Sequence, residues 1–269
     1  MKIAVLSDIH EGINRKNSGS DILEAFKKRV LELAPDVLII GGDLTAGPEK
    51  SLRLLKRLEI EMPHIQTLYV HGNHDIYDTD SNRAYKILME FKGNLGHGPV
   101  HLTDQWVVIG EGGWYDYSFG VDGYTEDEFA VGRFNDFIWP DKEYANWMKS
   151  DKLVTDRYCA KIEQWLKENQ NKNIILVCHF VPFAHFVQVK NEPSWDFFNA
   201  MMGSSRLGQL AEKYGVKKII FGHIHTRFHE TINGIECICN PLGYFPHEWK
   251  LDSAQEEINA TLKLIELAH

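Results

Sequence analysis

Short runs of β-branched and other apolar residues alternate along this chain with stretches of helical periodicity. The runs at 3–6, 37–40 and 67–70 are separated by residues 21–33 and 48–58, whose apolar positions recur every three or four residues. This order predicts parallel strands joined by crossover helices, an α/β arrangement. Further strands are predicted at 106–109, 173–178, 218–221, 227–232, 235–239 and 258–264, and further helices at 81–91, 155–169 and 204–214.

Capping and turn residues mark several boundaries of these elements. Ser20 is the expected N-cap of the first helix, and Pro35 marks the end of that helix. Asn233-Gly234 stands between two apolar runs, which indicates a β-hairpin with a two-residue turn. Together with the alternation of elements, these signals predict an ordered α/β protein with at least one antiparallel hairpin.

The length of the chain, 269 residues, fits one domain over 1–269. Between 111 and 156 the alternation of strands and helices is lost, and Gly, Asp, Tyr, Phe and Trp are frequent. A structureless loop of this length is uncommon inside a compact domain unless it is functional. We therefore interpret 111–156 as an aromatic-rich insertion or lid over the core.

The charge balance limits the partners of the protein. The formal net charge of −9 at pH 7 disfavours binding to bulk nucleic acid. No apolar run approaches the ~20 residues of a membrane span, and the first residues are not typical of a signal peptide. The four cysteines are expected to be buried hydrophobes of a cytoplasmic protein. The sequence makes no prediction of oligomeric state.

Five of the predicted strands are followed directly by residues that can bind a metal ion or transfer a proton. Such a residue on its own is ordinarily a turn residue, a helix cap or a hydrogen-bonded polar group. Five such sets, each after a different strand, are not explained as separate turn residues. The carboxyl ends of parallel strands meet at one edge, and that edge is where α/β proteins bind ligands. The residues are Asp8, His10, Asp43, Asn73, His74, His179, His223 and His225.

The chemistry of this set suits a pair of metal ions. Carboxylate and amide oxygens combined with imidazole nitrogens favour Mn, Fe, Zn, Ni or Co over Ca²⁺ or a thiolate zinc site. A carboxylate such as Asp43 can bridge two cations ~3.5–4 Å apart. Two divalent ions against the carboxylates of Asp8 and Asp43 leave a positive centre, which would attract a phosphate group despite the acidic surface.

The ordered motifs resemble those of the calcineurin-like metallophosphoesterase superfamily, in its bacterial-type branch that acts on small substrates. The motifs are Asp8-x-His10, Gly42-Asp43, Gly72-Asn73-His74-Asp75, His179 and Gly222-His223-x-His225. The resemblance implies a four-layer α+β fold, a β-sandwich of two mixed sheets flanked by helices, with a dinuclear metal site at the carboxyl edge of the strands. It also assigns the hairpin and the final strand to the second sheet.

The resemblance further implies a role for each residue. With two divalent transition-metal ions bound, a metal-bridging hydroxide would attack phosphorus in line. His74 would be the catalytic residue that protonates or hydrogen-bonds the departing oxygen. The implied ligands are Asp8, His10 and His225 for the first metal, Asn73, His179 and His223 for the second, and Asp43 as the bridge.

Two departures from the family pattern bear on the substrate. Many members carry an Asp three residues after the bridging carboxylate, which can orient the catalytic histidine, and this chain has Ala46 there. Asp75 or Glu49 are the possible substitutes. The chain also lacks the Arg that follows the bridging Asp in Ser/Thr protein phosphatases. Both departures argue against a protein phosphatase and favour small phosphate esters.

Aromatic residues near the predicted site are candidates for substrate binding. Trp114, Tyr115 and Phe183 are the expected contacts, because aromatic side chains can stack on a base or on another flat group. The alternative is that such residues pack the insertion against the core. Either arrangement is compatible with their position after predicted strands.

The favoured function is a phosphodiesterase that acts on a small or nucleotide-like phosphate ester. A phosphomonoesterase of the same family is the first alternative. A catalytically silent metal-binding scaffold is the second, although every ligand position is filled. A metal-dependent exonuclease is the third, and it would require a DNA-binding surface that the acidic charge balance disfavours.

Overall fold

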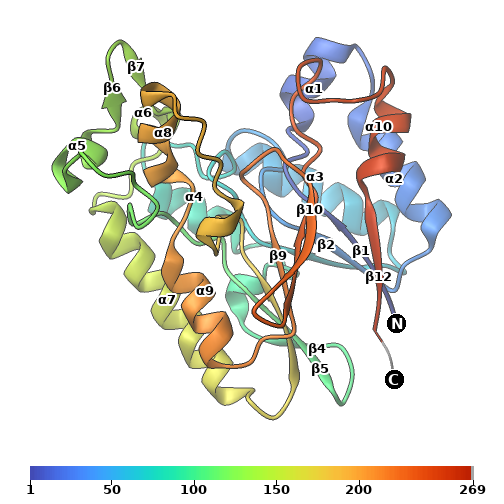
Figure 1. The fold of residues 1–269 in the computed structure, drawn as a ribbon. Helices are drawn as coiled ribbons and strands as arrows, with labels where there is room; N and C mark the ends of the chain where they lie inside the picture. Colours follow the sequence, from blue (N-terminus) through green and yellow to red (C-terminus); the bar gives the residue numbers. More distant parts are fainter. Residues whose placement is uncertain (268–269) are drawn as a thin grey trace.

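Two mixed sheets form the framework of the structure, a computed structural model that describes residues 1–267 (Figure 1). In the first sheet three strands are parallel and β12 is antiparallel to β1. Its order is β12 (Lys263–Glu266), β1 (Lys2–Leu6), β2 (Val37–Ile40) and β3 (Gln66–Tyr69). The second sheet has four parallel strands between two antiparallel edges. Its order is β10 (Phe228–Ile232), β11 (Ile235–Cys239), β9 (Lys218–Phe221), β8 (Asn173–Val177), β5 (Trp106–Gly110) and β4 (Val100–His101).

The two sheets pack face to face, because alternate residues of their strands share one buried cluster. Ile3 and Val5 of β1 lie in this cluster together with Ile175 and Val177 of β8. Ala4, between the two β1 residues, belongs to a different cluster on the outer face of the first sheet. Strands that are buried on both faces therefore read as continuous apolar runs in the sequence.

Helices cover the outer face of each sheet and complete four layers (Figure 1). On the first sheet lie α2 (Ile22–Leu33), α3 (Pro48–Glu61) with α4 (Ser81–Leu88) beside it, and α10 (Ala254–Thr261). On the second sheet lie α7 (Asp151–Glu168) and α9 (Ser205–Lys213). Shorter helices lie at the edges: α1 (Glu11–Ser18), α8 (Pro193–Phe198) and the 3₁₀ turns η1 (Leu95–His97), η2 (Ala184–Phe186) and η3 (Asn199–Met201). This arrangement confirms the expected sandwich of two mixed sheets flanked by helices.

The end of the chain differs from the sequence prediction in two ways. Helix α10 occupies most of the segment 258–264 that was expected to be a strand, and the strand begins only at Lys263. Ser253 caps α10 by accepting a hydrogen bond from the Glu256 N–H at 3.3 Å, a capping pattern that outweighs the local alternation. The final strand β12 then pairs with β1 in the first sheet, not in the second sheet as expected.

Several helix boundaries also differ from the prediction, among them the starts of α2 and α7. Asp21 rather than Ser20 caps α2, because its carboxylate accepts a hydrogen bond from a backbone N–H one turn further on. Helix α7 begins at Asp151 rather than at 155, because Ser150 supplies its N-cap. The Asn233-Gly234 turn joins β10 and β11 as expected.

The predicted insertion contains short regular elements rather than an irregular lid. These are α5 (Glu126–Val131), the hairpin of β6 (Arg133–Phe134) and β7 (Phe137–Ile138), and α6 (Pro140–Tyr144). Backbone hydrogen bonds attach the end of the insertion to the segment before α4: the N–H of Asp78 donates to Tyr144 at 2.9 Å, and that of Ser81 to Asn146 at 2.8 Å. The insertion is therefore anchored beside the loop that follows β3.

None of the helices within residues 1–267 combines the length and the apolarity that crossing a bilayer requires.

Two glycines permit the loops after the strands to approach one another closely. Gly42 has a φ of +93°, in the left-handed region that favours glycine, and a Cβ there would lie 2.5 Å from Nδ1 of His179. A Cβ at Gly72 would lie 2.0 Å from Oδ1 of Asp43. A side chain at either position would separate the loops that carry the predicted site.

We predict that Gly42→Ala lowers the free energy of unfolding by about 2–3 kcal/mol more than Gly123→Ala does. Gly123 is a matched control, because its φ is +96° and an added Cβ would meet no atom within 4 Å. Both variants carry the same backbone cost, and only Gly42→Ala adds a clash. Urea denaturation measures the difference, and equal losses would contradict the close approach of the loops.

Candidate metal centre

The seven predicted ligands and His74 lie together at the carboxyl ends of five strands. Strands β1, β2, β3, β8 and β9 each end directly before a loop that carries one of the motifs. The first sheet supplies Asp8, His10, Asp43, Asn73 and His74, and the second sheet supplies His179, His223 and His225. The side chains therefore meet as the sequence analysis expected, while their role as ligands stays a prediction.

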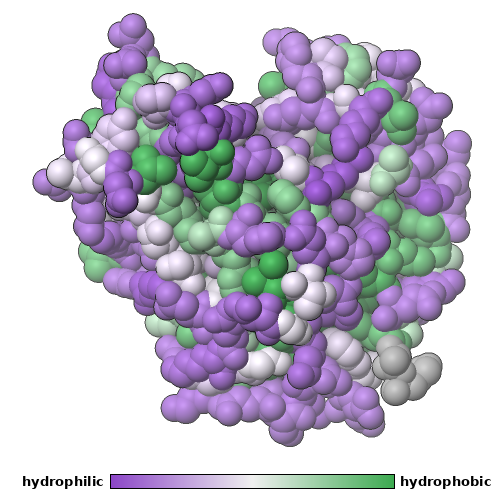
Figure 2. Space-filling view, in the orientation of Figure 1, coloured by the Kyte–Doolittle hydropathy of each residue, from purple (hydrophilic) through white to green (hydrophobic). Residues whose placement is uncertain are grey.

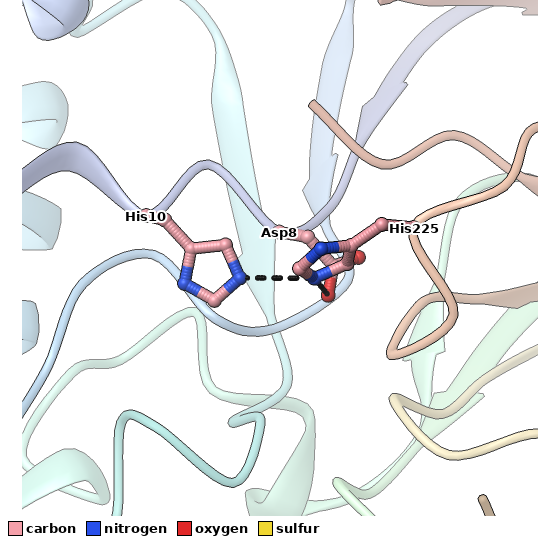
Figure 3. A group of neighbouring side chains, drawn as sticks. All are labelled: Asp8, His10 and His225. Carbon is pink, nitrogen blue, oxygen red and sulfur yellow. Dashed lines mark hydrogen bonds and ion pairs between the residues drawn. The ribbon is translucent and has the colours of Figure 1, made fainter. Parts of the chain in front are cut away.

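Asp8, His10 and His225 form the first group of possible ligands (Figure 3). Nε2 of His10 lies 3.1 Å from Nε2 of His225, and Nε2 of His225 lies 3.5 Å from Oδ1 of Asp8. Asp8 and His10 come from the loop after β1, and His225 comes from the loop after β9. One atom from each side chain lies within 4.8 Å of the other two, a spacing that one shared cation would satisfy.

Asn73, His179 and His223 form the second group. Oδ1 of Asn73 lies 3.1 Å from Nε2 of His179 and 3.1 Å from Nδ1 of His223. Asp43 lies between the two groups, since its Oδ2 is 3.4 Å from Nε2 of His179 and 3.8 Å from Nε2 of His10. This is the position that a bridging carboxylate requires.

The distances between these atoms fit the coordination shell of a transition metal. Ligand atoms that lie about 2.1 Å from a cation are about 3.0–3.4 Å apart at octahedral or tetrahedral angles. The closest contacts within the two groups are 3.1 Å, and those to the carboxylates are 3.4 and 3.5 Å. The mixed oxygen and nitrogen donors thus fit a metal pair in both type and spacing.

Hydrogen bonds fix the outer ring nitrogens of three histidines. His179 donates from Nδ1 to the Gly41 carbonyl at 2.9 Å, and His223 donates from Nε2 to a backbone carbonyl at 3.2 Å. His225 donates from Nδ1 to the Glu248 carboxylate at 2.6 Å. Each bond leaves the lone pair of the other nitrogen directed to the centre, which is how proteins orient histidine ligands.

Four of the predicted ligands adopt left-handed backbone angles. Their φ values are 51° for Asp8, 46° for His10, 52° for Asp43 and 71° for His223. Such angles cost a non-glycine residue about 1–2 kcal/mol. Backbone hydrogen bonds between the loops hold the strained residues, because the Asp8 N–H donates to Gly42 at 3.0 Å and the His10 N–H to Asp43 at 2.9 Å. Strain that the surroundings maintain in this way is typical of functional loops.

Neither Asp75 nor Glu49 orients His74. The buried Asp75 carboxylate accepts hydrogen bonds from four backbone N–H groups of the loops after β2 and β3. Burial, together with the charge of Asp43, raises the pKa of Asp75 to about 6. Glu49 pairs with Arg83 at the surface. Asp75 therefore organises the backbone of the site, and Glu49 lies outside it.

His74 instead contacts Tyr244. The hydroxyl of Tyr244 lies 3.3 Å from Nε2 of His74, and the Tyr244 ring stacks on His10 with centroids 4.3 Å apart. The backbone N–H of His74 donates to Oδ1 of Asp43 at 2.8 Å. With 25% of its side-chain surface exposed, the imidazole is accessible to a substrate while its backbone is fixed by the central carboxylate.

The buried carboxylates and imidazoles shift one another's pKa values. Burial acts to raise the pKa of Asp8, but the hydrogen bond from His225 and the charge of His179 bring it to about 2. Burial acts to lower the pKa of His179, but the charge of Asp43 raises it to about 9. Burial acts to lower the pKa of His225, but Asp8 and Glu248 raise it to about 10. Because a histidine binds a cation only after losing this proton, metal binding would release protons here.

The sequence analysis did not identify three residues that support the site: Asp141, Tyr244 and Glu248. Asp141 belongs to the insertion and accepts a hydrogen bond from Asn73 at 2.8 Å. The other two follow β11 near the end of the chain. None of the three stands at a strand end or at a fixed spacing from a motif, so the sequence pattern holds no signal that links them to the ligands.

A cavity of about 760 Å³ opens beside the two groups of ligands. His74, His223, His225 and Tyr244 line it on the side of the predicted ligands. The remaining wall comes from the insertion and from residues 188–202. It includes Phe137, Trp139, Gln188, Lys190, Glu192, Trp195, Phe198, Asn199 and Met202.

Trp114, Tyr115 and Phe183 do not line this cavity, and their contact with the substrate stays a prediction. Trp114 and Tyr115 are 1% and 0% exposed, and their rings stack on each other with centroids 4.8 Å apart. Phe183 packs against Gly208 of α9. The physical reason is that the chain enters the core directly after β5, so the first aromatics of the insertion pack there.

Known proteins are similar to this chain in sequence and in fold. Residues 1–227 match the calcineurin-like phosphoesterase family. The DNA double-strand break repair protein Mre11 of Methanococcus maripaludis is 26% identical over 253 residues, which cover 87% of this chain and 54% of that protein. A transmembrane protein with a metallophosphoesterase domain from Bos taurus is 33% identical over 102 residues, 38% of this chain and 21% of that protein. The chain thus spans about half the length, or less, of these relatives.

Two solved structures superpose on most of the chain. The phosphopantetheinyl hydrolase from Mycobacterium tuberculosis has a TM-score of 0.75, with 19% identity, and covers 93% of this chain and 91% of its own. A dimetal phosphatase from Danio rerio has a TM-score of 0.55, with 10% identity, and covers 89% and 86%. The family match includes all five motifs from residue 8 to residue 225. The chain therefore belongs to the calcineurin-like phosphoesterase family and is a metallophosphoesterase with a candidate dimetal site.

Proposed function

We propose that this protein hydrolyses phosphodiesters of small or nucleotide-like alcohols at a centre of two divalent transition-metal ions. One observation carries the proposal: nitrogen and oxygen donors from five strand ends converge in two groups on either side of Asp43. When bound, the ions would supply a nucleophilic hydroxide at neutral pH and neutralise charge on the phosphate. The ligands are Asp8, His10 and His225 on one side, Asn73, His179 and His223 on the other, and Asp43 between them.

His74 is the proposed acid for the departing oxygen. Its imidazole lines the cavity, and its backbone is held by the central carboxylate of Asp43. Nε2 lies 3.3 Å from the Tyr244 hydroxyl and 3.9 Å from Oδ2 of Asp43, and these contacts limit rotation of the ring. From this position His74 would protonate or hydrogen-bond the oxygen that leaves phosphorus.

The charges that line the cavity favour a diester over a monoester. Among the lining residues that the structure describes, Lys190 is the single Lys or Arg, while Glu192 and Glu248 are acidic. A phosphomonoester carries up to two negative charges at neutral pH and gains most from additional cations, whereas a phosphodiester carries one. The positive charge of the metal pair alone is therefore sufficient to bind the phosphate group of a diester.

The wall of the cavity opposite the ligands is aromatic and suits a flat organic group. Trp139 stacks on Phe198 with ring centroids 5.5 Å apart, while Phe137 and Trp195 are 53% and 44% exposed. Figure 2 shows hydrophobic residues gathered over the part of the molecule that carries α6 and α8. They lie beside the hollow that separates this part from the part that carries α1 and α10. Exposed aromatic surface next to a phosphate site can stack on a base or a similar ring.

Other members of the family suggest further substrates for the same centre. The shared fold with a phosphopantetheinyl hydrolase makes a phosphopantetheinyl ester a second candidate substrate. The Mre11 relative is a DNA repair protein, but the formal charge of −9 on this chain argues against DNA as the substrate. Small diesters remain the substrate class that the cavity favours.

We expect Asp43→Asn to abolish retention of the metal pair and to lower turnover by about 1,000-fold or more, because the bridge and its charge are lost together. Asp122→Asn is the matched control, since Asp122 is exposed on the insertion. Metal per chain after gel filtration and hydrolysis of a diester with Mn²⁺ are measured in parallel. Full activity of Asp43→Asn would refute the mechanism, and a wild type that retains metal but hydrolyses no ester would favour the scaffold alternative.

We expect bis(p-nitrophenyl) phosphate to be hydrolysed with a kcat/KM about tenfold or more above that of p-nitrophenyl phosphate, a difference of about 1.4 kcal/mol. The reason is the shortage of cations around the phosphate site beyond the metal pair. Both esters release p-nitrophenolate, and both are assayed with Mn²⁺ under the same conditions. A higher kcat/KM for the monoester would make the protein a phosphomonoesterase instead.

The aromatic wall predicts a preference for a flat alcohol. Thymidine 5′-(p-nitrophenyl phosphate) and methyl p-nitrophenyl phosphate share a leaving group, and stacking worth about 1–3 kcal/mol should favour the thymidine ester about 10–100-fold in kcat/KM. Trp195→Ala should reduce this ratio. Val131→Ala, an exposed apolar residue outside the cavity, should keep it. A ratio near one for the wild type would contradict the stacking role.

A further inference from the structure

Asn73 is the one amide among the seven predicted ligands, and its orientation decides whether it can bind a metal. The two ends of an amide have nearly the same shape, but only the oxygen has a lone pair for a cation. In the structure Oδ1 faces the ring nitrogens of His179 and His223, and Nδ2 points away from them. A rotated amide would direct N–H groups at both imidazoles and remove one donor from the second group of ligands.

We propose that Asp141, which belongs to the insertion, is a positioning residue that holds the oxygen of Asn73 toward the metal pair. The inference rests on the proposed dimetal function. Nδ2 of Asn73 donates to Oδ1 of Asp141 at 2.8 Å and to the Tyr77 hydroxyl at 3.2 Å. The Tyr77 hydroxyl donates in turn to the same Oδ1 at 2.8 Å. Both hydrogens of the amide therefore have acceptors on the side away from the ligands.

The surroundings of Asp141 keep its carboxylate in the role of acceptor. Its Oδ2 accepts a hydrogen bond from Nε1 of Trp139 at 2.9 Å, in addition to the two bonds to Oδ1. The residue is only 1% exposed, so water does not compete for these donors. An amide oxygen turned toward this carboxylate would face an acceptor instead of a donor, which makes the rotated form of Asn73 unfavourable.

Two residues of the insertion, Asp141 and Trp139, connect the metal ligand to the substrate cavity. Trp139, which bonds to Asp141, forms part of the cavity wall and stacks on Phe198. Its ring centroid lies 6.2 Å from that of His223. Backbone hydrogen bonds between the insertion and the segment before α4 hold this unit beside Asn73. The insertion therefore contacts a predicted metal ligand and also forms part of the cavity wall.

The test is a calorimetric titration of the full chain with Mn²⁺. The wild type is expected to bind two ions. Asp141→Ala should weaken one of the two sites by about 10–100-fold, the effect typical of losing a carboxylate behind a metal ligand, and leave the other site unchanged. Unchanged affinity at both sites of Asp141→Ala would overturn the inference.

Two further variants separate positioning from a general structural role. Asp151→Asn alters another carboxylate of the insertion, one that bonds Trp114 and Tyr117, and it should lower the melting temperature without changing Mn²⁺ affinity. The exchange variant N73D/D141N reverses the hydrogen bond, because an amide at 141 donates to a carboxylate at 73 whose two oxygens need no orientation. It should restore Mn²⁺ affinity to within about tenfold of the wild type.

The outcomes distinguish this inference from the proposed function. A wild type that binds no Mn²⁺ would refute the dimetal function and the inference with it. A wild type with two sites would leave that function intact, and an exchange variant as weak as Asp141→Ala would then overturn the positioning role alone. If Asp141→Ala does not fold, the exchange variant and Asp151→Asn decide the question, since both keep a polar side chain at each altered position.

Discussion

The carboxylate of Asp43 is buried between loops from both sheets, and the surrounding residues are shaped to receive it. Its Oδ1 accepts the backbone N–H of His74, and its Oδ2 faces the imidazoles of His10 and His179 at 3.8 and 3.4 Å. Gly72 has no side chain where a Cβ would lie 2.0 Å from Oδ1. Because a buried negative charge requires compensation, binding of a cation at this point is favourable. Metal binding would therefore be linked to the stability of the folded protein.

The convergence of the candidate ligands could be predicted from sequence because each one is tied to the end of a strand. Apolar runs locate β1, β2, β3, β8 and β9, and the residue that follows each run must lie at the shared edge of the sandwich. The ordered motifs then identify the family, which supplies the pairing of the two sheets. The predicted position of the final strand was wrong, because Ser253 and Glu256 cap a helix where the apolar pattern alone favours a strand.

The residues that support the ligands could not be predicted, since their positions depend on tertiary structure alone. Asp141 reaches Asn73 from a segment without periodicity, and Tyr244 and Glu248 lie beyond residues 1–227, which match the family. The aromatic residues expected to contact the substrate lie apart from the cavity for a related reason. Trp114 directly follows the loop of β5 and is carried into the core, whereas Trp139 lies after the hairpin of the insertion and reaches the cavity.

The candidate ligands and the aromatic wall stand on different parts of the fold. The candidate ligands lie on short loops of the two sheets, where backbone hydrogen bonds and missing Cβ atoms leave little freedom to vary. The aromatic wall stands on the insertion and on residues 188–202, and Asp141 of the same insertion reaches Asn73. Under the proposed function, a change of substrate would act through the residues around Trp139 and would have to preserve Asp141, the neighbouring carboxylate proposed to hold Asn73.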